Sequence, residues 1–588
     1  MKVKNKGQSR AIQLFEKTPI KKAIFIVALP GLLSMLMMGL YSFFNQVFIL
    51  NFVPKTIALF NDDLSGVQGN IYTYLREGTP IISHSTFNEM WKTYNSFVQP
   101  DSRISQISSD IVSSISINAT IPFMLFGNAL ALLIPVGASV YYTKCISKKV
   151  ENTAKNLFAM SFWTTLTLTL FSTFIILLAI WTNLTGLITS HTKFDTNALI
   201  MLDNTANWTN VANSKVFVEY YKASHDISTA WANSYLYCFA ICAAVQGMYL
   251  LLSFFIRAEG KNSYVMIWAI IANLVGLALD AVFIIVFRLG ILGGALATLV
   301  GWTINLFAYF IYVLINSKNG DTWISFKELI KFKMDWQILM PIMLLGISAF
   351  VRTLGVAVLN LVVTVLLNKL PYSDGFINVY NWAKASPSIT LFFVALFGIS
   401  DGAAPLLSYN YTQGNNRRVK ETYYWTLFIS FMYSIIIYVI VALLAKYFIK
   451  LLYVPEGRTN DVIKYIRINM LRMVFYSFCI GGMLLFRGTN NIKMSIFICA
   501  LESFITLWFV MGACVGIGFI LYGLGVSKNI CALMVSVGFS VNALTCALIV
   551  QFISSRWLKK TLPNIGYIRK SWSKKIEDQF FENAIKIN

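Results

Sequence analysis

Charged residues are scarce in this 588-residue chain, and acidic residues are scarcer than basic ones. Asp, Glu, Lys and Arg together make up 13% of it, whereas hydrophobic residues make up 57%. Soluble domains carry about 25% charged residues, so the composition excludes an ordinary soluble domain and indicates a membrane protein. The formal charge is nevertheless +22. The basic residues form no stripe with interleaved aromatics, so we expect basic loops beside a membrane and no nucleic-acid partner.

Motifs for redox, ATP-driven and metal-dependent chemistry are also lacking. The eight cysteines include no CxxC pair, and Cys238 and Cys242 share a helix face among apolar residues, which favours a packing role. No GxxxxGK(S/T) phosphate loop is present. We see no paired carboxylates or Asp cluster of the kind that a membrane-embedded transferase needs. His84, His191 and His225 fall in polar loops. We expect no enzyme, no cofactor and no metal site beyond a Na⁺ site described below.

Long apolar runs are abundant. Each is about as long as, or longer than, the roughly 20 residues that a helix needs to cross a bilayer. The runs are 22–50, 116–142, 156–183, 231–256, 264–287, 292–316, 337–367, 377–405, 423–447, 462–486, 493–518 and 527–553. We therefore expect an all-α polytopic membrane protein with twelve transmembrane helices.

Basic residues gather in alternate loops between these runs. The N-terminal segment is rich in lysine and holds a single acid, Glu16. The other basic segments are 144–155, 257–261, 318–333, 417–420, 487–493 and the tail after 556. Cytoplasmic loops are enriched in Lys and Arg. We expect a multi-pass protein of the cell membrane, with these loops and both termini in the cytoplasm.

Motifs of the first half of the chain recur in the second half. The matched pairs are Leu29-Pro30 with Met340-Pro341, the turn 144–155 with 413–421, and the turn 257–262 with 487–491. Each half holds six spans, an even number, so the halves should be related by an axis along the membrane normal. Such a repeat is typical of secondary transporters, with a site between two related bundles.

The repeat divides the chain into parts. They are an N-terminus (1–21), an N-lobe of six helices (22–316), a cytoplasmic linker (317–336), a C-lobe of six helices (337–553) and a basic tail (554–588). The offset between matched motifs shrinks along the chain, so the N-lobe must hold extra residues. We place them in two polar external insertions, about 54–115 and 184–230, as decorated loops or binding elements. The tail is compatible with an interfacial or a solvated segment.

Glycines and prolines interrupt several spans. They are Gly31, Gly39, Gly293, Gly294, Gly398 and Gly402, with Pro30, Pro122, Pro341, Pro387 and Pro405. Membrane helices tolerate such residues where they bend or line cavities. The alternative is close helix packing through small residues.

Four stretches carry a family resemblance. They are ALPGLLSMLMMGLYSFFNQVFI from Ala28 to Ile49, then FIRAEGKNSY with LVGLALDAVFII and GILGGALAT, then FGISDGAAPLLSYNYTQGNNRRVKE, then LLFRGTNNIKMS. In this order they resemble the multidrug and toxic compound extrusion (MATE) transporters, within them the DNA-damage-inducible (DinF-like) branch. The resemblance implies two six-helix lobes around a central cavity and export by alternating access coupled to Na⁺ or H⁺. We expect a monomer in the lipid bilayer with a small amphiphilic substrate.

The resemblance also implies a coupling-cation site in the N-lobe. In the family, a fifth-span Asp in an N-x-x-x-D arrangement works with a first-span Asp and a sixth-span Thr. Here the fifth-span Asp is Asp280 and the Thr is Thr298, whereas Asn45 replaces the first-span Asp and Gly276 the fifth-span Asn. Asn45 can offer a carbonyl oxygen to Na⁺ but cannot carry a proton. The alternative is that Asp280 has a structural role as a hydrogen-bonding residue.

The C-lobe spans hold more cations than acids. Arg352, Arg467, Arg472 and Lys384 stand against Glu502 and Asp401. Charges within a membrane are costly and mark functional sites. A basic excess suits an anionic head group, so the candidate cavity residues are Arg352, Arg472, Lys384 and Glu502. An Arg352–Glu502 ion pair is the alternative and would reduce the excess.

The sequence therefore leaves several functions open. The leading interpretation is a MATE-like secondary exporter of amphiphilic organic compounds or drugs. A flippase for an anionic lipid-linked substrate is the alternative that the arginines favour. A membrane-embedded transferase and a non-transporting scaffold are further alternatives.

Overall fold

The computed structural model describes residues 11–62, 69–98, 103–104, 106–189, 192, 194–205, 213–371, 373, 375–451, 459–560 and 572–587, and these residues form helices and connecting segments without a β-sheet. Within these residues, twelve helices are long and apolar enough to cross a membrane, as the sequence predicts. They are α2 (Ile20–Phe52), α4 (Ser109–Lys148), α5 (Glu151–Trp181), α8 (Ser214–Ala258), α9 (Asn262–Ala281) with η5 (Val282–Val286), α10 (Ile291–Lys318), α11 (Trp336–Lys369), α12 (Gly375–Thr412), α13 (Asn416–Leu451), α14 (Thr459–Gly488), α15 (Ile492–Ala500) with η8 (Leu501–Ile505) and α16 (Thr506–Gly523), and α17 (Lys528–Lys560).

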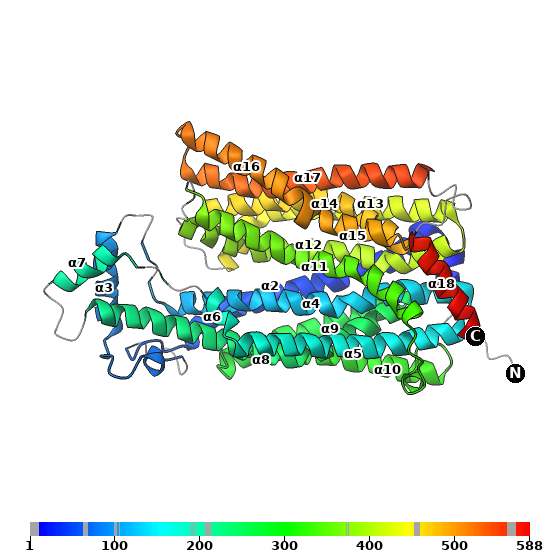
Figure 1. Cartoon of the computed structure of the whole chain (residues 1–588), viewed down its shortest axis with the longest axis horizontal. Helices are drawn as coiled ribbons and strands as arrows, with labels where there is room; N and C mark the ends of the chain where they lie inside the picture. The colour runs from blue at the N-terminus through cyan, green and yellow to red at the C-terminus, as the bar shows by residue number, and fades with distance from the viewer. Residues whose placement is uncertain are drawn as a thin grey trace.

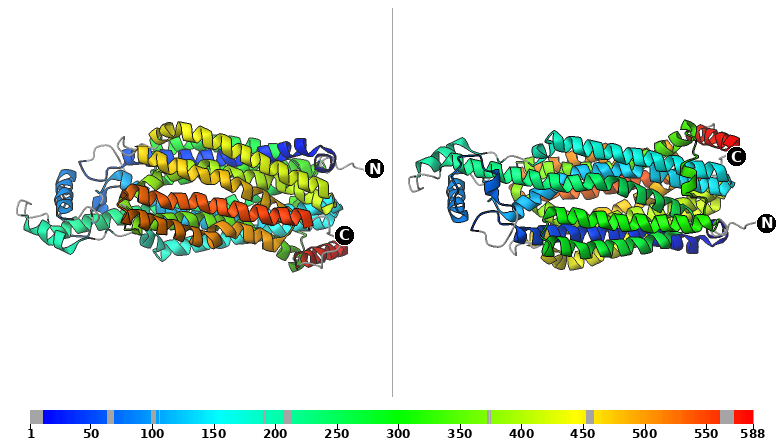
Figure 2. Two further views of the ribbon diagram at one scale, coloured as in Figure 1. Left: turned by 90° about the horizontal axis from the view of Figure 1, so that it is seen from above. Right: turned by 90° about the horizontal axis from the view of Figure 1, so that it is seen from below.

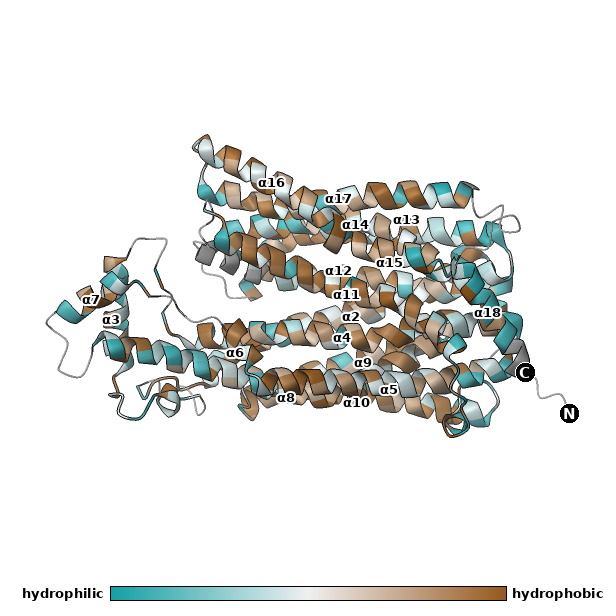
Figure 3. Ribbon diagram, in the orientation of Figure 1, coloured by the Kyte–Doolittle hydropathy of each residue, from teal (hydrophilic) through white to brown (hydrophobic). Residues whose placement is uncertain are grey.

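The long helices form two bundles that lie side by side (Figure 1). The N-lobe contains α2 to α10 and the C-lobe contains α11 to α17. We call the end where α2 begins and α18 (Trp572–Ile587) lies the basic end. The end that carries α3 (His84–Phe97) and α7 (Thr196–Asn204) is the insertion end (Figures 1 and 2). Hydrophobic residues fill the middle of the long helices, while hydrophilic residues collect toward the ends (Figure 3). This banding is what a bilayer-spanning bundle requires.

Matched turns of the two lobes share an unusual backbone conformation. The first turn has left-handed residues at Lys149 (φ 59°) and Gly414 (φ 73°). The second has them at Gly260 (φ 78°) and Asn490 (φ 56°). A left-handed residue just past a helix end stops the helix and lets the chain reverse. The repeat seen in the sequence is therefore a repeat of local structure as well.

The first long helix of each lobe packs against the second long helix of the other lobe. α2 of the N-lobe lies against α12, and α11 of the C-lobe lies against α4. A Cβ at Gly31 would collide with the Gly398 carbonyl, and a Cβ at Gly137 with the Ile342 carbonyl. These contacts lie in the halves of the helices nearer the basic end, so the backbones of the two lobes meet closely there. The glycines therefore serve close packing, the alternative left open by the sequence.

The external insertions are more helical than the sequence predicts. They contain η2 (Val53–Thr56), η3 (Ile71–Tyr74), α3 (His84–Phe97), α6 (Leu184–Ile188) and α7 (Thr196–Asn204). α8 begins at Ser214, because Asn213 caps it by accepting from the Val216 amide. Aromatic rings stack in the insertion core, with His84 lying 4.6 Å from the ring of Phe60. No cluster of metal-binding side chains occurs among the described residues, and His191 lies outside them.

The C-terminal tail differs from both predicted alternatives, because its last helix packs on the protein. α18 spans Trp572–Ile587. Phe580 is fully buried, and its ring lies 4.7 Å from that of Tyr141 in α4. The Lys144 ammonium, with a fully buried side chain, lies 2.5 Å from the Glu577 carboxylate. Because α18 contacts α5 as well as α11, it bridges the two lobes at the basic end (Figure 1).

Candidate functional site

The residues proposed for the coupling site come together in the N-lobe, toward the insertion end. Asp280 is fully buried near the end of α9. The Asn45 amide nitrogen, in α2, donates to Asp280 Oδ1 at 3.1 Å and lies 3.2 Å from the Gly294 carbonyl oxygen. Thr298, in α10, donates to the same carbonyl at 2.9 Å. Three helices therefore place these polar side chains at one point.

A tyrosine that the sequence analysis missed joins the group. The Tyr41 hydroxyl lies 2.8 Å from Thr298 Oγ1 and accepts from the Asn45 amide at 3.2 Å. Tyr41 precedes Asn45 by one helical turn, so the i, i+4 spacing was a signal that it shares this face. A Cβ at Gly276 would lie 3.0 Å from the Tyr41 ring, tighter than an ordinary contact. Gly276 thus makes room for Tyr41 and supplies no ligand side chain.

The carboxylate of this group is incompletely satisfied. Asp280 Oδ2 has no hydrogen-bond partner among the described residues. The π-helical segment η5 follows Asp280 almost at once, and such segments often occur at functional sites. A buried carboxylate without a cation is costly unless a proton or a cation neutralises it.

We tested whether these residues fit Na⁺. Asp280, the Thr298 hydroxyl and the Gly294 carbonyl are oxygen ligands of the type that hard cations prefer. The Asn45 nitrogen, a donor, faces Asp280 Oδ1, so Asn45 would have to turn its amide to offer its oxygen to a cation at that atom. Asp280 Oδ2, which has no partner among the described residues, is the carboxylate oxygen left open to a proton or a cation.

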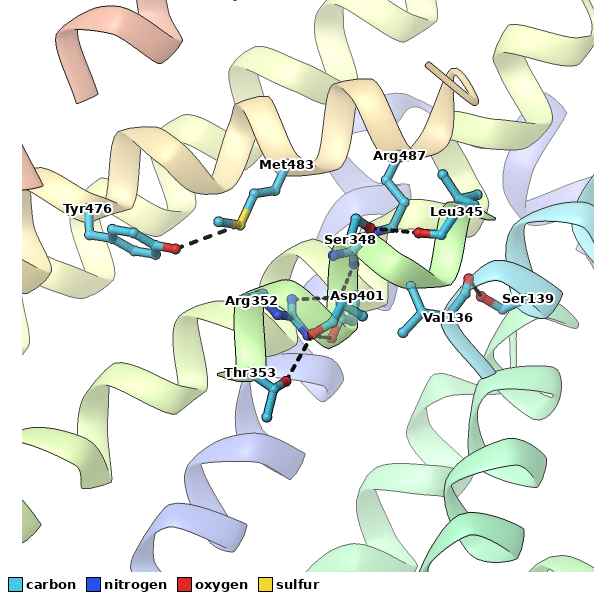
Figure 4. Close-up of polar contacts among 11 residues, drawn as sticks. Val136, Ser139, Leu345, Ser348, Arg352, Thr353, Asp401, Tyr476, Met483 and Arg487 are labelled. Atoms are coloured by element: carbon cyan, nitrogen blue, oxygen red, sulfur yellow. Dashed lines mark hydrogen bonds and ion pairs between the residues drawn. The ribbon is translucent and has the colours of Figure 1, made fainter. Parts of the chain in front are cut away.

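Three of the four candidate cavity charges of the C-lobe, Arg352, Arg472 and Glu502, are paired and buried. Arg472 Nε lies 2.7 Å from Glu502 Oε1, and the guanidinium lies 4.4 Å from the centre of the Phe393 ring. Arg352 contacts Asp401 at 3.3 Å, and Asp401 also binds Arg487 from α14 (Figure 4). The Arg352–Glu502 pair considered from the sequence is wrong, because each residue has a different partner.

These pairings change the charge balance of the C-lobe. Arg352, Arg472 and Glu502 are 6%, 8% and 5% exposed, so they lie inside the lobe. Arg467 is on the outside and donates to the Ala442 carbonyl at 3.2 Å. Lys384 is half-buried and within electrostatic reach of Asp110 across the lobe interface. Two arginines, Arg352 and Arg487, share the single carboxylate of Asp401, so this group of three residues keeps a net positive charge.

Another buried carboxyl group, Glu259, was missed by the sequence analysis. It follows α8 at the basic end and is 7% exposed. The Tyr142 hydroxyl donates to it at 2.7 Å and the Tyr312 hydroxyl at 3.3 Å, and the Thr322 hydroxyl donates as well. Thr322 belongs to the linker between the lobes. The signal in the sequence was a single acid within the basic turn 257–262.

The Glu259 cluster should make stability depend on pH. Burial raises the pKa of Glu259 from 4.5 to about 7, against the opposing effect of the three hydroxyls and Lys261. The folded state therefore binds this proton more tightly. Its contribution, at most about 3 kcal/mol, is complete below the unfolded pKa of about 4.5 and is lost as the pH rises through about 7.

The apparent melting temperature of the purified protein should fall between pH 5 and pH 8 for this reason. The change Glu259→Gln should remove most of that fall, because the amide does not titrate. Glu421→Gln, at a 40% exposed side chain, is the control and should keep it. An identical pH profile for Glu259→Gln and the unaltered protein would show that Glu259 does not set the dependence.

Comparisons with known proteins agree with this architecture. The MatE family model matches residues 348–511, within the C-lobe. An uncharacterized protein of Mycoplasmoides gallisepticum is 26% identical over 497 residues, 81% of this chain and 80% of that protein. The multidrug export protein MepA of Staphylococcus aureus is 24% identical over 316 residues, 52% of this chain and 66% of MepA.

The fold is similar to that of solved MATE transporters. A MATE crystal structure in complex with MaL6 has a TM-score of 0.62 and 17% identity, covering 94% of this chain and all of that one. An outward-facing multidrug resistance MATE transporter has the same TM-score and 16% identity, over 94% and 99% of the two chains. The DinF-like branch stays a prediction. The MatE family model thus matches a part of the C-lobe, and the chain has the fold of solved MATE transporters.

Proposed function

We propose that the protein is a secondary active exporter of amphiphilic organic compounds, working as a monomer in the cell membrane with its basic end in the cytoplasm. The observation that carries this proposal is the buried, incompletely satisfied Asp280 among Asn45, Tyr41 and Thr298, on three helices of a MATE-like lobe. A transporter needs a group whose charge state differs between two conformations, and a buried carboxylate without a counter-charge is such a group.

The coupling ion in this proposal is a proton. Asp280 is the one carboxylate of the group, and the amide nitrogen of Asn45 faces it at 3.1 Å. A proton neutralises Asp280 without displacing that amide, whereas Na⁺ would require it to turn. Na⁺ remains the alternative ion, because hydroxyl and carbonyl oxygens lie nearby.

The substrate in this proposal is an organic amphiphile. The Arg472–Glu502 pair is neutral overall, so Arg472 does not repel a cationic compound as an unpaired buried arginine would. The name of MepA states multidrug export for that protein. A flippase for an anionic lipid-linked substrate is the second candidate, favoured by the two arginines that share Asp401.

Alternating access in this proposal includes a step that separates the lobes at the basic end. α18 contacts both lobes there, so it must leave one of them during that step. Breaking the Lys144–Glu577 pair would leave a charge buried unless water reaches it. The last helix therefore opposes opening at the basic end and favours the conformation described here.

Export from cells tests the proposal. Two probes are used, the cationic dye ethidium and an anionic fluorescent amphiphile. Expressed in an efflux-deficient bacterium, the protein should lower the accumulation of one or both by about threefold or more. A protonophore should remove the effect, because the gradient is the energy source. Cells carrying the empty vector are the control. Equal accumulation of both probes with and without protein in the membrane would contradict export of this class of compound.

A further inference from the structure

The repeat places equivalent arginines at the ends of α8 and α14. Along the sequence, Arg257 precedes the left-handed Gly260 by the same number of residues as Arg487 precedes the matched left-handed Asn490. Both are buried, at 5% and 1% exposure. A buried guanidinium needs an anionic partner, since an unpaired buried charge is costly. The partners of these two arginines can therefore be compared directly.

Only the C-lobe arginine of this pair has a carboxylate bound to it. Arg487 binds Asp401, which lies before the left-handed Gly414. In the N-lobe, the residue that precedes the left-handed Lys149 by the same number of positions is Val136. Val136 is 1% exposed and packs with Phe254. Figure 4 shows both Val136 and Asp401. The N-lobe has thus an apolar side chain where the C-lobe has the counter-ion.

Arg257 is left without an ion pair among the described residues. Its Nη1 atom has no hydrogen-bond partner there, and the guanidinium lies 5.6 Å from the centre of the Phe254 ring. The carboxylate that reaches it electrostatically is Asp401. That carboxylate is already bound by Arg352 and Arg487. Arg257 therefore has positive charge available for a ligand.

Arg257 lines a cavity within the N-lobe. The cavity, about 40 Å³, lies between α2, α8, α9 and α10 and is partly open to its surroundings. Its lining includes Ser34, Ser253 and Asn305, with apolar walls such as Met38 and Trp302, and no acidic residue. Asn305 is 5% exposed, and its Oδ1 atom has no partner among the described residues. Two unpaired buried polar groups thus line one amphiphilic space.

The cavity is separate from the coupling group. Ser34 and Asn45 both lie in α2, about 16 Å apart along the helix at 1.5 Å per residue. Arg257 lies at the basic end of α8 and Asp280 toward the insertion end of α9. An anion beside Arg257 would therefore leave the Asn45–Asp280 contact in place.

We propose that this cavity binds an amphiphile with an anionic head group, a carboxylate or a phosphate, held by Arg257. A guanidinium offers two parallel donors to either head group. The amide nitrogen of Asn305 can donate to the head group, and the apolar walls and the open side of the cavity take the chain of the ligand. The role of this ligand as a transported substrate rests on the proposed function, whereas its binding does not.

Equilibrium binding to the purified protein tests the proposal without any gradient. The probes are hexyl phosphate, hexanoate and hexyltrimethylammonium, which have short chains that stay out of micelles, and inorganic phosphate. We expect saturable binding of hexyl phosphate or hexanoate, weakened about tenfold or more in Arg257→Gln, because a charge-assisted hydrogen bond is lost. Asn305→Asp keeps the side-chain size, adds a negative charge, and should weaken anion binding similarly.

The variants and probes separate the outcomes. Arg467→Gln, at an arginine on the outside of the C-lobe, should bind as the unaltered protein does. If Arg257→Gln does not fold, Asn305→Asp still decides the question. Anion affinity unchanged in Asn305→Asp, or tighter binding of hexyltrimethylammonium than of both anions, would overturn the proposal. Inorganic phosphate binding as tightly as hexyl phosphate would overturn the amphiphile assignment. Export of other compounds in cells would be unaffected by these outcomes, so the two proposals can fail separately.

Discussion

Changing Asp280 to Asn should reduce gradient-driven export to the level of cells without the protein. The amide has nearly the same shape as the carboxyl group, so the contacts with Asn45 at 3.1 Å can be kept. It cannot bind a proton or balance the charge of a cation. If Asp280 is the coupling residue, transport against a gradient stops while the protein still folds and reaches the membrane. The measurement is efflux of a transported dye from energised cells, normalised to the amount of membrane protein.

Two variants make this result specific. Asp461→Asn removes a partly exposed acid in the first turn of α14, paired with Lys464 at 3.0 Å, and should leave efflux unchanged. Asn45→Asp places a second carboxylate beside Asp280 and should strengthen the dependence of efflux on protons or Na⁺, because two close carboxylates do not both stay charged without a cation. Efflux at the normal rate in Asp280→Asn would leave Asp280 as a structural residue.

Changing Asp401 to Asn should cause the largest loss of stability. Asp401 lies between Arg352 and Arg487 (Figure 4), and both arginines are almost completely buried. Without the carboxylate, two buried guanidinium groups lose their anionic partner, and removing one partner of a buried ion pair costs about 3–5 kcal/mol. The variant should give little folded protein and a clearly lower apparent melting temperature.

A second change identifies the cause of that loss. Arg352→Met removes one of the two cations, so Asp401→Asn should cost less in that background than in the unaltered protein. The melting temperatures of the four proteins form the cycle that measures this interaction. A loss of the same size in both backgrounds would mean that the cost does not come from the unpaired charge of Arg352.

The sequence predicted those features that depend on local pattern. Spans follow from apolar runs, and the twelve predicted runs correspond to the twelve long helices. The repeat was predicted from the similar residues of the matched turns, and in the structure these turns share a left-handed residue, Gly260 in one and Asn490 in the other. The meeting of Asn45, Asp280 and Thr298 followed from family resemblance, since no pattern within one helix links residues on three helices.

Features that depend on tertiary contacts could not be predicted. The partner of Glu502 is decided by tertiary packing: the sequence suggested Arg352, whereas Arg472 of α14 binds it. α8 extends to Ser214 because aromatic side chains of the insertions pack together there. α18 has charged residues throughout, and only docking on Tyr141 and Lys144 explains why Phe580 is buried. Each case needs a partner that is far away in the sequence.

Gradient-driven transport in proteoliposomes tests the central claim most directly. A compound exported from cells is loaded equally on both sides, and a pH gradient or a Na⁺ gradient is imposed separately. We predict that the pH gradient moves the compound against its own concentration gradient in the unaltered protein, that the Na⁺ gradient alone does not, and that Asp280→Asn responds to neither. Accumulation at equal rates in Asp280→Asn and the unaltered protein under the pH gradient would contradict the account.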